Sequence, residues 1–95
     1  MGATFTPGPW VANNHMFIKA PNGFTVALVR GPSGRGKEYY EGLPYCQANA
    51  RLIAAAPELL EALDAVELAR MTDEPKHWDA ATTLTAKAIA KARGQ

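Results

Sequence analysis

The chain has 95 residues, the size of one small domain, which leaves no room for a second hydrophobic core. Apolar residues make up 47% of it, but 18 of them are alanines, which bury little surface, so we expect a thin core. The single cysteine excludes an internal disulfide, and a net charge of +1 excludes a strong general attraction for nucleic acid.

Targeting and cofactor signals are not evident in the sequence. No apolar run approaches the roughly 18 residues of a transmembrane helix, and the N-terminus lacks the basic and apolar regions of a signal peptide. We therefore expect the protein in the cytoplasm, without a membrane partner, a metal or a cofactor. Small domains with thin cores are commonly stabilised by self-association, so a homo-oligomer is predicted.

Residues 1–30 are predicted to form a three-stranded antiparallel β-meander. A Pro-Asn-Gly turn suits a three-residue hairpin loop, which sets the register of the strands on either side of it. In this register Ile18 faces Val26 and Leu28 also lies on the core face, whereas Val29 lies on the outer face. The three segments rich in β-branched and aromatic residues are 10–13, 15–20 and 24–30.

Residues 46–95 are helical in character. Pro57 interrupts the first helix, because proline disfavours helix at the preceding residue and suits the start of a new one. The predicted helices cover 47–55, 58–71 and 76–92. The fold class is therefore α+β, a single domain in which the N-terminal meander packs against two to three C-terminal α-helices.

The intervening residues, 31–45, are predicted to form a glycine-rich basic loop. The loop matches the phosphate-loop pattern formally, but Glu38 stands where Ser or Thr should bind magnesium, and a meander lacks the required parallel sheet. A weaker interpretation is an anion site, in which backbone amides and basic side chains bind phosphate while tyrosines stack on a base. The alternative is a solvated connector. The predicted ligand-binding residues are Arg30, Ser33, Gly34, Arg35, Gly36, Lys37, Tyr39 and Tyr40.

Catalytic and metal-binding residues are not predicted. Cys46, His15 and His77 have no partner nearby in the sequence that would make a triad or a metal site, so an enzyme is disfavoured. Alanine-rich helices permit close helix approach, and the predicted contacts of the homo-oligomer are Ala48, Ala50, Ala54, Ala55, Ala56, Ala81, Ala88 and Ala92.

Two segments of the chain are distinctive, namely TPGPW at residues 6–10 and ANARLIAAAPELLEAL at residues 48–63. Together they resemble a family of small bacteriophage and prophage proteins. The resemblance implies a viral protein that acts in the host cytoplasm, with no established catalytic residues. Small phage accessory proteins often block host defence, and one way is to sequester nucleotide-derived immune signals in an oligomer.

These observations favour a non-enzymatic oligomeric binder that sequesters a nucleotide-like or phosphate-bearing small molecule. The alternative is an inhibitor or adaptor that binds a host protein through its acidic helix and the mixed outer sheet face around Phe17, Lys19 and Thr25. Nucleic-acid binding through the basic C-terminal residues is disfavoured by the acidic helix before them.

Overall fold

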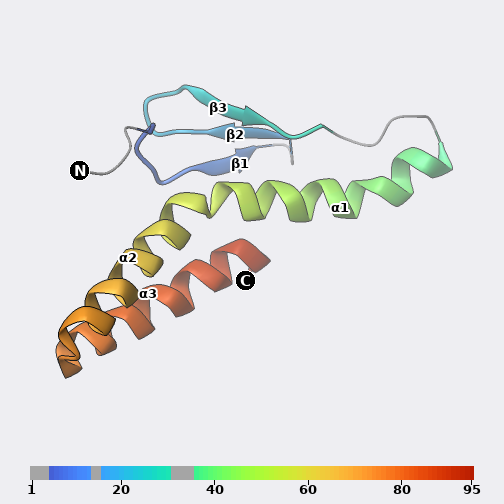
Figure 1. Ribbon diagram of the computed structural model, residues 1–95. Helices are drawn as coiled ribbons and strands as arrows, with labels where there is room; N and C mark the ends of the chain where they lie inside the picture. The colour runs from blue at the N-terminus through green and yellow to red at the C-terminus, as the bar shows by residue number, and fades with distance from the viewer. Residues whose placement is uncertain (1–4, 14–15, 31–35) are drawn as a thin grey trace.

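A computed structural model describes residues 5–13, 16–30 and 36–95, with the side chains of Glu38 and Tyr39 excepted. These residues form three strands and then three helices, which confirms the α+β class (Figure 1). The sheet is antiparallel with the order β1-β2-β3, so it is the predicted meander. The elements are β1 Val11–Asn13, β2 Phe17–Lys19, β3 Thr25–Leu28, α1 Lys37–Ala54, α2 Ala56–Thr72 and α3 Pro75–Arg93.

The molecule is elongated. The sheet covers one side of α1, and the α2–α3 hairpin projects from the end of α1 on the other side (Figure 1). The principal extents are 54 × 26 × 16 Å, and the radius of gyration is 16.1 Å. A compact domain of this length has a radius of gyration of about 12 Å. Much of the chain therefore lies in a layer only one or two elements thick.

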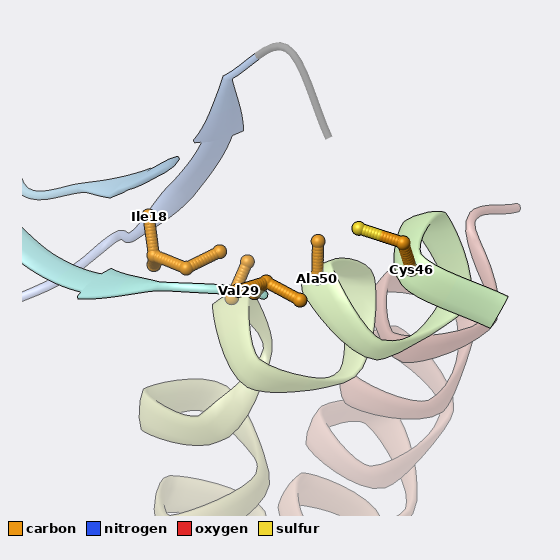
Figure 2. Packing of buried hydrophobic residues seen from close by; sticks show 5 residues of the cluster. Ile18, Val29, Cys46 and Ala50 are labelled. Carbon is orange, nitrogen blue, oxygen red and sulfur yellow. The ribbon is translucent and has the colours of Figure 1, made fainter. Parts of the chain in front are cut away.

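The main core lies between the sheet and α1. Cys46, Ala50 and Ala54 follow one another at four-residue spacing, so they line one face of α1, and they pack against Ile18 and Val29 (Figure 2). Ile18 is the one large side chain among the described residues that is completely buried. The core thus depends on a single isoleucine seated on small helical side chains.

A β-bulge between β2 and β3 changes the predicted register. Lys19 pairs with Thr25 as expected, but Ile18 pairs with Ala27 and Val26 is the extra residue. From Ala27 onward, each side chain of β3 therefore points to the side of the sheet opposite to the predicted one. Leu28 is exposed and Val29 is buried, the reverse of the sequence-based prediction.

Helix α1 begins at Lys37, within the predicted loop 31–45. Gly42 and Pro44 favour a loop, because glycine is a weak helix former and proline cannot donate the helical hydrogen bond. Leu43 is nevertheless half-buried and Cys46 is buried, so packing against the rest of the fold stabilises this stretch as helix. The break before α2 is confirmed, with Pro57 in its first turn.

The two segments that carry the resemblance touch each other. The Trp10 indole Nε1–H donates a 2.9 Å hydrogen bond to the Thr6 carbonyl, and Phe5 packs edge-on against the Trp10 ring. This folds residues 5–10 back so that Gly8 lies against Pro57, where an added Cβ would come within 3.2 Å of the proline Cβ. The N-terminal segment therefore packs on the α1–α2 junction, and a side chain at position 8 would require the proline to shift by a few tenths of an ångström.

Helices α2 and α3 pack through alanines spaced by seven residues. Ala62 and Ala69 on α2 and Ala81 and Ala88 on α3 are each at most 4% exposed, and we call these four the alanine seam. A repeat of seven is the spacing at which two helices keep the same faces in contact. Small side chains at such a contact allow the helices to approach closely.

Polar side chains close one side of the alanine seam. Lys91 Nζ donates hydrogen bonds of 2.9 and 3.0 Å to the two Glu58 carboxylate oxygens, near the start of α2. At the other end of the hairpin, Thr72 Oγ1 lies 2.6 Å from His77 Nδ1. These contacts fix the alignment of the two helices, because they hold the hairpin at both ends.

Packing within the chain bears on the predicted oligomer contacts. Five of the eight alanines proposed for that contact are buried within the single chain, so they are not available to a second molecule. These five are Ala50, Ala54, Ala55, Ala81 and Ala88.

Candidate functional site

The predicted anion site is only partly within the described residues. Ser33, Gly34 and Arg35 lie outside them, as does the side chain of Tyr39. Arg30 is exposed just after β3, whereas the other three residues lie together where α1 begins. Gly36 precedes the helix with a φ of 65°, Lys37 is its first residue, and the Tyr40 N–H donates a 3.1 Å hydrogen bond to the Gly36 carbonyl.

The start of α1 attracts anions weakly. Unpaired N–H groups and the helix dipole give a helix N-terminus partial positive charge, and no side chain caps this one with a hydrogen bond. Lys37 Nζ lies 3.7 Å from Glu41 Oε1, and both side chains are largely exposed, so the pair contributes little. Tyr40 is 70% exposed. These groups form an open surface, whereas small-molecule sites bury most of their ligand.

A small pocket lies at the opposite end of the sheet. Pro7, Gly8, Pro21 and Asn22 line a volume of about 140 Å³. This is below the ~300 Å³ of the smaller ligand sites, and no charged side chain lines it. The pocket is therefore too small and too apolar for the nucleotide-like ligand that the sequence suggested.

The outer sheet face is the side of the sheet that is exposed to solvent. We use this name for the side chains that point away from α1, which are Val11, Asn13, Phe17, Lys19, Thr25 and Leu28. Val11, Phe17 and Leu28 are 54, 40 and 50% exposed, so the solvent-facing side of the sheet carries three exposed apolar side chains. Phe17 on the central strand pairs with Leu28, whereas Val11 pairs with Lys19. Lys19 Nζ donates a 2.6 Å hydrogen bond to Thr25 Oγ1 and lies 5.8 Å from the centre of the Phe17 ring.

Sequence reasoning found only half of the outer sheet face. It placed Phe17, Lys19 and Thr25 there but missed Val11, and it assigned Leu28 to the core. The bulge brings Leu28 across from Phe17, and no residue pattern in the strand marks the position of the bulge. The nearest available signal is that both Leu28 and Val29 are apolar, so that either fits the core.

Two other potentially reactive side chains, those of Cys46 and His77, take part in packing contacts. Cys46 is buried in the main core, and His77 contacts Thr72 at the hairpin tip. Within residues 5–13, 16–30 and 36–95 no three Cys, His, Asp or Glu side chains gather as a metal site would require. None of the helices in that part of the chain combines the length and apolar character needed to cross a bilayer.

Comparison with known protein families gives a match over the length of the chain. The model of a protein family described as Salmonella phage P22 protein Y8K6 matches residues 1–95. This confirms the resemblance to phage proteins. No curated protein and no solved structure matches the chain significantly.

Proposed function

We propose that this chain, which belongs to the Salmonella phage P22 protein Y8K6 family, is a non-enzymatic accessory protein that binds another protein through its outer sheet face. The supporting observation is the exposed apolar group of Val11, Phe17 and Leu28 on that face. Exposed apolar side chains with polar residues among them are typical of a protein interaction site. In the phage setting the partner is a host protein, and the chain acts as an inhibitor or adaptor.

The composition of the outer sheet face suits a protein better than a small molecule. Phe17 offers a rigid ring on the central strand, and Asn13, Lys19 and Thr25 supply polar groups beside the apolar side chains. The face is a sheet surface rather than a cavity, so it cannot enclose a small ligand, but it can lie flat against another protein.

Site-specific cross-linking tests this proposal. A photo-reactive amino acid at Val11 is expected to give a discrete cross-linked species in host cells, whereas the same group at exposed Lys87 on α3 is not. Leu28→Lys should abolish that species. Leu52→Lys is the matched control, because Leu52 is 54% exposed but lies on α1. Equal cross-linking from Val11 in both lysine variants would contradict the proposal.

A second candidate function is sequestration of an anionic, nucleotide-like molecule at the start of α1, as an anti-defence protein would do with an immune signal. It is supported by the uncapped helix N-terminus beside Lys37 and Tyr40. Because these groups are exposed, a second protein molecule would have to complete the site.

A thermal-shift screen with cyclic dinucleotides, cyclic trinucleotides and ADP-ribose tests the second candidate. If one of them binds, the double change Arg35→Ala and Lys37→Ala should weaken binding by roughly a hundredfold, since each charge-assisted hydrogen bond contributes roughly 1.5–3 kcal/mol. Lys76→Ala, on exposed α3, serves as the control. Absence of any shift with the whole panel would decide against this candidate.

A further inference from the structure

The turn between β2 and β3 places an asparagine directly before a glycine on the surface. Asn22 and Gly23 are both exposed, and Gly23 has a φ of 90°. Apart from the two neighbouring residues, no heavy atom of the described residues lies within 4 Å of the position that a Cβ on Gly23 would occupy. Asparagine is chemically labile when the next backbone nitrogen can reach its side-chain amide, and glycine leaves that nitrogen unshielded.

A hydrogen bond from Phe24 holds the Asn22 side chain over the following peptide. The Phe24 N–H donates a 3.0 Å hydrogen bond to Asn22 Oδ1. The ring that this bond closes contains the Gly23 nitrogen, so the side-chain amide is folded back toward the group that would attack it. A donor at Oδ1 also withdraws electrons from Cγ and stabilises the negative charge that develops on Oδ1 during an attack, as the donors of an oxyanion hole do.

One hydrogen bond of the turn opposes such an attack. The Gly23 N–H donates a 3.0 Å hydrogen bond to the Ala20 carbonyl, and this bond must open before the nitrogen can react. A turn hydrogen bond at the surface contributes little net free energy, because water replaces it when it opens. It therefore slows the attack by roughly tenfold and does not prevent it.

The small pocket beside the turn leaves room for the reaction. Asn22 lines it together with Pro7, Gly8 and Pro21, and its volume of about 140 Å³ is enough for several water molecules. The side chain of Asn22 thus lies against open, hydrated space. Asn49 offers a contrast within the same molecule, because it lies inside α1 and precedes Ala50, which is completely buried.

We propose that Asn22 is a site of spontaneous deamidation in the folded protein. The Gly23 nitrogen forms a bond to Cγ of Asn22 and loses its proton to water, while the bond from Cγ to Nδ2 breaks and ammonia leaves. Water then opens the resulting succinimide ring. Opening at Cγ gives aspartate, and opening at the main-chain carbonyl gives isoaspartate. The sequence consumes one water, releases one ammonia and changes no oxidation state. It does not depend on the proposed function.

Isoaspartate at position 22 changes the hairpin, because it adds one carbon atom to the main chain. The turn is closed by hydrogen bonds of 2.9 Å from the Ala20 N–H to the Phe24 carbonyl and 3.0 Å from the Gly23 N–H to the Ala20 carbonyl. A longer main chain cannot keep both bonds in this geometry. Deamidation therefore loosens the β2–β3 hairpin as the protein ages, and the isoaspartate form should have a lower Tm than the unmodified protein.

Peptide mapping by mass spectrometry, after incubation of the folded protein at mildly alkaline pH, tests the proposal. The peptide that contains Asn22 should gain the mass difference between an amide and a carboxyl group, and an isoaspartyl methyltransferase should methylate it. The peptide that contains Asn49 should stay unchanged. In Gly23→Ala the modification at position 22 should be lost over the same incubation, because a Cβ shields the attacking nitrogen. An unchanged rate in this variant would contradict the assigned nucleophile.

The chain unfolded in urea is the positive control, and incubation continues until its Asn22 is modified. This control separates the reactivity of the Asn22–Gly23 pair from the effect of the folded turn. A folded protein that stays intact at position 22 over that time would overturn the proposal, because the turn would then protect the asparagine. Equal modification of Asn49 and Asn22 in the folded protein would also overturn it, because position 22 would then not be a distinct site.

Discussion

Enlarging one residue of the alanine seam should destabilise the protein strongly. Ala88 is completely buried between closely packed helices, and Ala88→Leu adds three carbon atoms there. Overpacking a well-packed core costs about 1–3 kcal/mol, and we expect a value of about 2–3 kcal/mol because small residues on both helices leave little room to adjust. For a domain of this size that lowers the Tm by roughly 10–20 °C.

Thermal and urea unfolding, followed by far-UV circular dichroism at one fixed protein concentration, measures this effect. Ala86→Leu is the matched control, because Ala86 is exposed on the same helix two residues away. Its free energy of unfolding should change by no more than about 0.5 kcal/mol. If both variants unfold at the same temperature, the helices do not meet through a closed alanine seam and the reasoning fails.

Three further predictions concern polar and backbone features. In a double-mutant cycle with Glu58→Gln and Lys91→Met, urea unfolding should give a coupling free energy of about 1 kcal/mol that falls with added salt. A coupling free energy of zero would mean that the pair does not stabilise the contact between α2 and α3. Gly23→Ala should lower the free energy of unfolding by about 1–2 kcal/mol, because Gly23 has a φ of 90°, and Gly23→Asn should lower it less. Equal stability of the unaltered protein and the two variants in thermal unfolding would contradict the turn geometry. The pKa of Glu67 is lowered from its ordinary value of 4.5, mainly by its hydrogen bonds from Arg70, so the pair should stabilise the folded state above about pH 4.5 and lose this effect as the pH falls through the lowered pKa. In Arg70→Gln the pKa of Glu67 measured by NMR should return toward 4.5, and an unchanged pKa would refute the assignment.

Features set by neighbouring residues were accessible from the sequence. The three strand segments, the break at Pro57 and the third helix follow from local turn and helix signals. Gly36 and Lys37 are neighbours in the sequence, so their proximity was also evident. Their position at the start of a helix was not. Residues 37–44 are helical because Leu43 and Cys46 pack against other parts of the fold. Local helix propensity carries no information about these packing contacts.

The surfaces that carry the proposals were decided by the tertiary structure. One extra residue, Val26, in the β3 pairing turned Leu28 outward and Val29 inward, because side chains alternate along a strand. Counting alanines showed that helices could approach closely, but only the packed hairpin showed that Ala81 and Ala88 meet α2 of the same chain. Alternation and spacing are local properties of a sequence, whereas the partner that covers a given face depends on contacts between residues far apart in the chain.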